Sequence, residues 1–291
     1  MTSYAVAVGM IVAPDGRILL QQRDHDRPAG GMWGLVGGRV EPGETPAQAF
    51  LRETQEETGW RPRRLEPWLM RDVTWDGEAV RSHVFAAHLD VPPESLVVGE
   101  GLALALFPPD ALPPDTVPGI DALAREFARD GAYERQRRHY EKTFAAGMIV
   151  APDGRLLLQH RDDKPGIINP GKWATFGGHI EPYETPEDGF VREIEEELAW
   201  RPSRFERYWA RPCACDGPEH LVYSFVAPLD VPPDALEQRE GQGMGFFAPD
   251  ALPEPLVPEV RLEVERVLAG GWHARAIAEL SARFELDGAV S

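Results

Sequence analysis

The sequence has no long apolar run and few basic residues. No stretch approaches the roughly 18 apolar residues of a membrane helix, and the N-terminus lacks a basic region before an apolar core. We therefore expect a soluble, cytoplasmic protein. Lys and Arg number 30 against 48 Asp and Glu, a formal net charge of −18. This argues against a nucleic-acid or anionic-membrane partner, because such partners require dense positive charge; small anionic substrates are not excluded, since bound cations reverse the local field.

Cysteine is scarce, with only Cys213 and Cys215 in the chain. So close a spacing is compatible with a metal or redox pair. A second interpretation follows from the repeat described next, because at its offset the two cysteines align with Val73 and Trp75 in a predicted strand. That alignment favours small core or strand residues.

One segment occurs twice. GRVEPGETPAQAFLRETQEETGW at 38–60 returns 140 residues later as GHIEPYETPEDGFVREIEEELAW at 178–200. A chain of 291 residues is long enough for two domains that each bury a core. We expect one domain over residues 1–135 and a second over 136–291, the second ending in an extra helix at 273–284. That helix is available for packing across the domains or for forming a homodimer.

The repeated segment predicts a helix that begins at about Pro46. Thr45 is a good N-cap, proline suits the first helical position, and Gln48 has the spacing of a capping box. Gly59 is a typical residue to end such a helix.

Three glutamates share one face near the end of each helix. Spacings of three and four residues bring their carboxylates together, where they repel each other and the negative end of the helix dipole. A solvated surface face is one interpretation. A divalent cation is the stronger one, because hard oxygen ligands suit Mg²⁺, which takes further ligands from a substrate phosphate. The predicted metal ligands are Glu53, Glu56, Glu57, Glu193, Glu196 and Glu197.

These residues carry a resemblance to the Nudix family. The pattern of a glycine, five residues, a glutamate, seven residues and then Arg-Glu-apolar-x-Glu-Glu-x-Gly-apolar resembles the Nudix box. It is present at Gly38, Glu44, Arg52, Glu53, Glu56, Glu57, Gly59 and Trp60, and again at Gly178, Glu184, Arg192, Glu193, Ile194, Glu196, Glu197 and Trp200. Thr54 departs from the usual aliphatic residue, and Ala199 replaces the second glycine, so the second helix is expected to end differently.

The resemblance implies two tandem α/β/α sandwich domains with mixed sheets. It also implies a hydrolase that uses Mg²⁺, with Mn²⁺ as an alternative, to cleave a phosphoanhydride bond in a nucleoside diphosphate linked to another moiety. The alternative is a regulatory protein in which one or both domains bind a nucleotide without hydrolysis. No box carboxylate is missing, which favours catalysis in both domains.

Further site residues follow from the resemblance and from position. Arg52 and Arg192 stand four residues before Glu56 and Glu196 and are expected to orient the glutamates. Glu100 and Glu240 lie in equivalent loops outside the box, where such proteins commonly supply a further metal ligand or a base; an ordinary turn is the other interpretation. The predicted substrate-binding residues are Arg23, Arg39, Arg161, His179, Gly38 and Gly178. Arg39 and His179 are equally compatible with exposed strand positions.

The start of each domain predicts a hairpin. Apolar runs at 5–12 and 17–22 flank Ala-Pro-Asp-Gly, a turn signature, and runs at 144–150 and 155–159 repeat them. The polar loop that follows is two residues longer in the second copy. We expect this loop to distinguish the substrates of the two domains.

Overall fold

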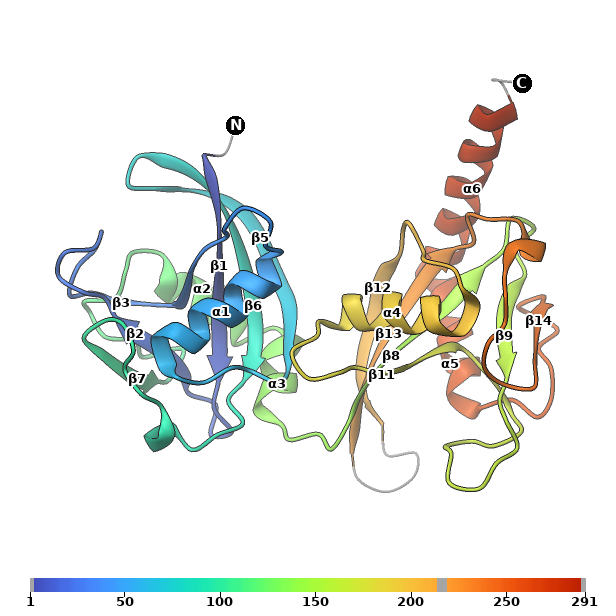
Figure 1. The fold of residues 1–291 in the computed structure, drawn as a ribbon, viewed down its shortest axis with the longest axis horizontal. Coiled ribbons are helices and arrows are strands. Elements are labelled where there is room, and N and C mark those ends of the chain that lie inside the picture. The colour runs from blue at the N-terminus through green and yellow to red at the C-terminus, as the bar shows by residue number, and fades with distance from the viewer. Residues whose placement is uncertain (1–2, 214–218, 289–291) are drawn as a thin grey trace. The chain divides into compact units, whose positions relative to one another are not determined.

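The chain, seen here in a computed structural model, forms two compact units. The structure describes residues 3–213 and 219–288, with side chains described as far as Ser281. The first unit comprises Met1–His139 with Pro182–Thr185, and the second comprises Tyr140–Glu181 with Pro186–Ser291 (Figure 1). The domain division predicted after residue 135 falls inside the helix Gly131–Arg137.

The elements follow the same order in the two units. Those of the first are β1 (Tyr4–Val12), β2 (Ile18–Gln22), β3 (Trp33–Gly34), β4 (Val36–Arg39), α1 (Pro46–Thr58), β5 (Leu65–Trp75), β6 (Glu78–His88), η1 (Pro93–Ser95), β7 (Ala103–Phe107), α2 (Ile120–Phe127) and α3 (Gly131–Arg137). Those of the second are β8 (Thr143–Val150), β9 (Leu156–His160), β10 (Trp173–Ala174), β11 (Phe176–His179), α4 (Pro186–Leu198), β12 (Glu206–Cys213), β13 (His220–Pro228), η2 (Pro233–Ala235), β14 (Gly243–Phe247), α5 (Pro258–Ala269) and α6 (Trp272–Gly288).

Each unit is built on a mixed sheet. In the first the strand order is β3-β2-β1-β6-β5, with β4 paired to β1 and β7 to β2. Strand β1 runs parallel to β6, and the other pairings are antiparallel. The second sheet has the order β10-β9-β8-β13-β12, with β11 and β14 attached in the same way. The predicted mixed sheets are therefore confirmed.

The predicted opening hairpins form only at their turns. Strand β1 pairs with β2 at a single position, Val12 with Ile18, and β8 pairs with β9 at two. Beyond the turn the strands part, because β1 pairs with β4 and β6 while β2 pairs with β3 and β7. The apolar runs were thus assigned correctly as strands, but their main partners lie far along the chain.

Helices cover both faces of each sheet. In the first unit α1 packs on one face, and α2 with α3 packs on the other (Figure 1). Phe50 of α1 stacks on Phe85 at 5.2 Å. A Cβ atom at Gly9 would lie 2.3 Å from the Phe50 ring, so a glycine in β1 is required for this close packing. The second unit repeats the contact with Phe190 and Gly147, which confirms the α/β/α layering.

The C-terminal helix α6 has a counterpart in the first unit, contrary to the prediction. Helix α3 occupies the same place after α2 that α6 occupies after α5, and the two make matching contacts. The Tyr133 hydroxyl donates to the Gly16 carbonyl at 2.7 Å, and His273 Nε2 lies 2.7 Å from the Gly154 carbonyl oxygen. The sequence comparison missed this because α6 continues for several turns after α3 has ended.

Matching ion pairs also show that α3 and α6 are equivalent helices. Arg135 of α3 holds the buried Glu66 of β5 through two bonds of 3.1 Å. In the second unit Arg275 of α6 donates to both oxygens of Glu206 at 3.2 and 3.1 Å. In both units, therefore, one arginine fastens the last helix to the edge strand of the sheet.

Two predictions, on the cysteine pair and on membrane helices, can be compared with the structure only over the described residues. Cys213 ends β12 and is largely buried, whereas Cys215 lies outside the described residues, so the assignment of the pair stays a prediction. Among the helices of residues 3–213 and 219–288, none is both long enough and apolar enough to cross a membrane.

Candidate active site

The box helix of the first unit begins and ends as its sequence predicts. Thr45 accepts from the Gln48 amide at 3.2 Å, and the Gln48 side chain accepts from the Thr45 amide at 2.8 Å, so the capping box is complete. Gly59 ends the helix with φ 68°. In the second unit Ala199 adopts φ 51° at the same place. The expected change in the helix end is therefore wrong: alanine takes the left-handed conformation despite its cost.

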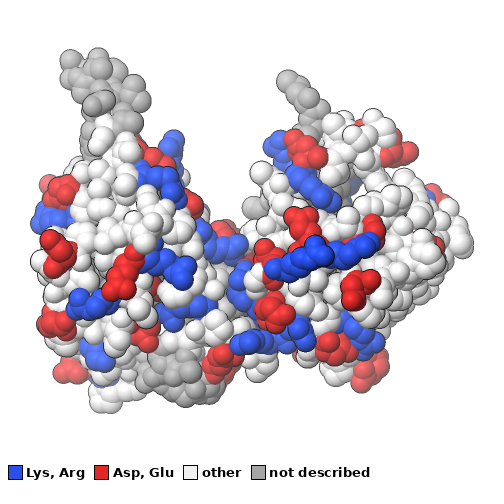
Figure 2. Space-filling model, turned by 180° about the vertical axis from the view of Figure 1, so that it is seen from behind, with Lys and Arg blue, Asp and Glu red and all other residues white. Residues whose placement is uncertain are grey.

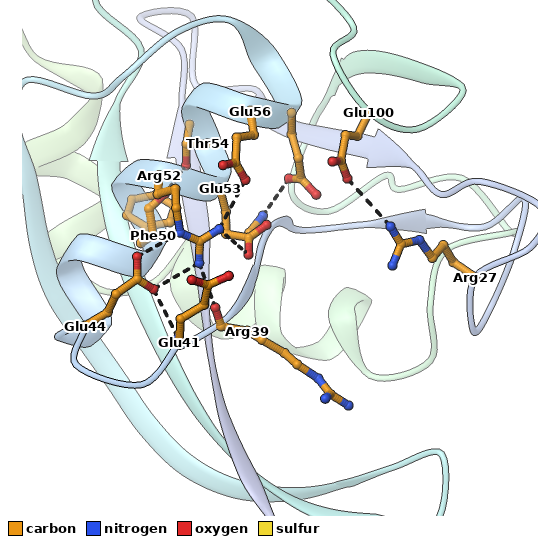
Figure 3. A network of polar contacts seen from close by, with 12 residues as sticks. Arg27, Arg39, Glu41, Glu44, Phe50, Arg52, Glu53, Thr54, Glu56 and Glu100 are labelled. Atoms are coloured by element: carbon orange, nitrogen blue, oxygen red, sulfur yellow. Dashed lines mark hydrogen bonds and ion pairs between the residues drawn. The ribbon is translucent and has the colours of Figure 1, made fainter.

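Arg52 lies at the centre of a carboxylate network (Figure 3). Its guanidinium donates to Glu44 at 2.8 and 3.0 Å, to Glu53 at 2.9 Å and to Glu56 at 3.1 Å. A fifth bond of 3.0 Å goes to the carbonyl of Arg39 on β4. These acceptors raise the pKa of Arg52 further above its ordinary value. The arginine thus fixes the orientation of two predicted ligands and ties α1 to β4.

Arg192 repeats this arrangement in the second unit. It donates to Glu193 at 2.8 Å, to Glu196 at 3.1 Å and to the carbonyl of His179 at 2.7 Å. The role predicted for the two arginines, to orient the glutamates, agrees with these contacts.

The last box glutamate is the most buried of the three. Glu57 is only 7% exposed, and one of its oxygens accepts from the Gly37 amide at 2.8 Å. Burial, together with the charges of Glu53 and Glu100, raises the pKa of Glu57 to about 8 although the Gly37 bond opposes the shift. Without a cation, this carboxyl therefore favours its protonated form.

Glu197 has the same surroundings in the second unit. It accepts from the Gly177 amide at 2.8 Å and from the Gln159 side chain at 3.0 Å. Burial raises the pKa of Glu197 to about 8, and the charges of Glu193 and Glu240 add to the effect.

The glycine pair makes room for the first box glutamate. A Cβ atom at Gly38 would lie 2.4 Å from the Glu53 carboxyl group, and one at Gly178 would lie 2.2 Å from Glu193. Burial raises the pKa of both carboxyls, while the neighbouring arginines oppose that shift. Any larger side chain at these glycines would displace a predicted ligand. Their role in binding substrate stays a prediction.

The loop that carries Glu100 is fastened to the end of α1. The Gly99 amide donates to the Glu57 carbonyl at 3.0 Å, and the Gln21 side chain donates to the Glu100 carbonyl at 2.9 Å. The Glu100 carboxylate is about half exposed and lies 4.0 Å from Arg27. Its charge acts on Glu53 and Glu57, as that of Glu240 acts on Glu193 and Glu197. The charge of each loop glutamate thus influences the box carboxylates of its own unit, and its role as a metal ligand or base stays a prediction.

The predicted substrate-binding cations differ in their surroundings. Arg23 donates to the Pro28 carbonyl at 2.8 Å, and Arg161 donates to the Ile168 carbonyl at 3.0 Å, so each holds the loop that follows it. Arg39 stacks on Tyr4 at 4.0 Å. His179 packs edge to face on Phe144 at 5.1 Å. Substrate binding by all four stays a prediction.

The donor set suits a hard divalent cation, although it is not assembled as a cluster. Within the described parts of the chain, no three His, Cys, Asp or Glu side chains are already grouped to hold a metal. In the first unit the reason is visible, since Arg52 binds Glu53 and Glu56 while Glu57 accepts from a backbone amide. Carboxylate oxygens that repel one another are nevertheless the donors that Mg²⁺ would neutralise.

Several site residues were not predicted. Glu44 belongs to the box but had no assigned role, and it is the strongest partner of Arg52. Gln159 in β9 and the amides of Gly37 and Gly177 hold the buried glutamates. A polar glutamine at the end of an apolar strand was the available signal for Gln159. The amides give no sequence signal, because every residue except proline has one.

Comparison with known proteins identifies the repeated unit. The model of the NUDIX domain family matches residues 3–127 and again residues 141–267. An 8-oxo-dGTP diphosphatase of Escherichia coli (strain K12) is 31% identical over 93 residues, which cover 27% of this chain and 72% of that protein. An octanoyltransferase of Myxococcus xanthus is 39% identical over 111 residues, 38% of this chain and 27% of that protein.

One solved structure is similar to part of the chain. The crystal structure of a MutT NUDIX hydrolase from Burkholderia pseudomallei is 31% identical, with a TM-score of 0.35, and the match covers 43% of this chain and 97% of that one. The chain spans less than half the length of the first curated relatives that it matches.

Proposed function

The chain belongs to the Nudix family, and from this we propose that it is a hydrolase with one active site in each of its two units. Each site would cleave a phosphoanhydride bond in a nucleoside diphosphate linked to another moiety. The observation that carries the proposal is the pair of carboxylate networks, each with a buried glutamate held by a backbone amide beside the arginine-bound glutamates. Burial raises the pKa of these buried carboxyls, and a bound cation would favour their charged form.

The metal would be held by the three box glutamates of each unit. These are Glu53, Glu56 and Glu57 in the first and Glu193, Glu196 and Glu197 in the second. When bound, Mg²⁺ or Mn²⁺ supplies Lewis-acid stabilisation of phosphate charge and lowers the pKa of a water molecule.

The chain's own residues prepare this chemistry. Arg52 holds Glu53 and Glu56 in fixed orientations through its guanidinium, and the Gly37 amide does the same for Glu57. Glu100, which lies outside the helix and is about half exposed, or a box carboxylate would accept the proton of an attacking water. The second unit would use Arg192, the amide of Gly177 and Glu240 in the same way.

The proposed substrate is a small nucleotide. The E. coli relative is named for such a substrate, 8-oxo-dGTP. On the face drawn in Figure 2, basic side chains lie among acidic ones in both units. The absence of nucleic-acid and membrane partners, and the formation of a homodimer, remain predictions. The substrate is selected by residues outside the box.

A substrate panel tests the proposal. Nucleoside triphosphates, nucleotide sugars, ADP-ribose and dinucleoside polyphosphates would each be incubated with Mg²⁺, and released phosphate and nucleotide would be measured. We expect turnover of at least one class, abolished by excess chelator. Binding of a nucleotide with no turnover of any class would favour the regulatory alternative, and full turnover in chelator would contradict the metal mechanism.

A further inference from the structure

Two arginines beside the first carboxylate network are each stacked on an aromatic ring. The Arg23 guanidinium lies 5.7 Å from the centre of the Trp75 ring, and the Arg39 guanidinium lies 4.0 Å from that of Tyr4. Both arginines adjoin the network: Arg23 interacts electrostatically with Glu57, and the Arg39 carbonyl accepts from Arg52. The aromatic rings are therefore one side chain away from the groups proposed to handle phosphate.

The strand register places three of these side chains on one face of the sheet. Tyr4 is opposite Val80 in β6, and Val80 is opposite Val73 in β5. Opposed residues share a face, and so do residues two apart on a strand, so Trp75 shares the face of Tyr4. Arg39 is opposite Val6, two residues after Tyr4, and shares that face as well.

Arg23 contacts Trp75 from the part of the sheet that contains β2, whereas Trp75 belongs to β5. Arg23 directly follows β2, which has parted from β1 after their single pairing at Val12 and Ile18. The contact between Arg23 and Trp75 therefore connects two parts of the sheet that the backbone pairing leaves separate at this end. Trp75 is only partly buried, and the Arg23 guanidinium lies over its ring.

A tight turn fixes the tryptophan. Trp75 is the last residue of β5 and pairs with Glu78 across Asp76 and Gly77. These two residues have φ of 51° and 80°, the positive values of the two-residue turn that fits the twist of a hairpin. The indole is thus carried on a short, well-defined turn, as a preorganised stacking surface requires.

We propose that Trp75 recognises the base of the first unit's substrate by stacking, with Arg23 beside it directed to the substrate's phosphates. Stacking on indole suits any planar base, so the substrate class is a nucleoside polyphosphate or nucleoside diphosphate derivative with its base intact. This inference rests on the proposed function, and it adds which part of the substrate the first site selects.

The second unit has a different residue at this position. The 140-residue offset aligns Trp75 with Cys215, which lies outside the described residues. The other stack changes as well: the strand register makes Phe144, which packs on His179, the counterpart of Val6, and Lys142 stands at the position of Tyr4. Base stacking on a hairpin tryptophan is therefore a property of the first site alone, and the second site selects its substrate by other means.

The test uses the full chain with Glu197→Gln, which disables the second site. KM and kcat would be measured for a nucleoside triphosphate and for ribose 5-triphosphate, which lacks a base. Trp75→Ala should raise KM for the nucleotide about tenfold to a hundredfold more than KM for the base-free compound and leave both kcat values within about twofold. Trp75→Phe should retain most of the affinity. Met70→Ala, an exposed change on the same strand, should alter neither.

Equal changes in KM for the two compounds, or no change in either, would overturn the inference while leaving the proposed function intact. A chain that hydrolyses neither compound leaves the proposed function to the rest of the substrate panel. In that case quenching of tryptophan fluorescence by the nucleotide decides the question. Quenching that Trp75→Phe removes supports stacking, and quenching that is absent, or unchanged in the variant, contradicts it.

Discussion

Burial of Glu57 without a metal should make the first unit less stable as the pH rises. Its pKa is about 8 in the folded chain, against an ordinary value of 4.5. The folded state therefore binds more protons than the unfolded state between pH 4.5 and about 8, and the free energy of unfolding falls as pH rises through that window. Glu57→Gln removes the titrating group and should remove the fall.

The magnitude follows from the separation of the two pKa values. At about 1.4 kcal/mol for each unit of pH, ionising Glu57 fully would cost at most about 5 kcal/mol. Relaxation and water entry reduce such costs, so about 2 kcal/mol is expected. For a domain of this size that corresponds to a change of about 6 °C in melting temperature.

The assay is thermal unfolding in chelator at pH 5 and pH 8.5. Glu57→Gln should melt about 6 °C above the wild type at pH 8.5 and within about 1 °C of it at pH 5. Glu56→Gln is the control, since Glu56 lies on the same helix with 49% of its side chain exposed. A Glu57→Gln variant that melts lower than the wild type by the same amount at both pH values would refute the reasoning.

Three other substitutions probe separate parts of the structure. Ala199→Gly should raise the free energy of unfolding of the second unit by about 0.5–1 kcal/mol in urea titrations, because it relieves a left-handed alanine; a loss of stability would contradict this. Arg52→Lys keeps the charge but cannot make five bonds in one plane, so the first site's kcat should fall at least about tenfold, measured with the second site disabled; an unchanged kcat would show that orientation by Arg52 is unimportant. Arg135→Ala leaves the buried Glu66 without its bidentate partner and should cost about 2–4 kcal/mol of unfolding free energy; a cost below about 0.5 kcal/mol would contradict the pairing.

Local features of the box could be predicted because their causes lie within a few residues. The capping box of Thr45 and Gln48 and the common face of the glutamates depend only on helical spacing. The two-unit organisation was visible for the same reason, since the repeat preserves those spacings.

Features that depend on distant partners could not be predicted. The opening strands were expected to form a hairpin, but β1 gains its pairing from β6, which lies more than sixty residues away. The five acceptors of Arg52 illustrate the same limit: Glu56 is four residues away and was predicted, whereas the Arg39 carbonyl is supplied by a separate strand.

The length of α6 concealed its relation to α3. One shared contact involves different residue types, since Tyr133 in one unit and His273 in the other reach equivalent backbone carbonyls. The other keeps its residue types, because Arg135 with Glu66 and Arg275 with Glu206 stand 140 residues apart, and this was an available signal in the sequence.

The most direct test of the two-site account is to disable each buried glutamate separately. Turnover of the best substrate from the panel would be measured with Mg²⁺ for Glu57→Gln, Glu197→Gln and the double variant. Two independent sites predict that each single variant keeps the activity of the other unit and that the double variant loses at least 99% of the total. A double variant that remains fully active would contradict the account, because the chemistry would then lie outside both carboxylate networks.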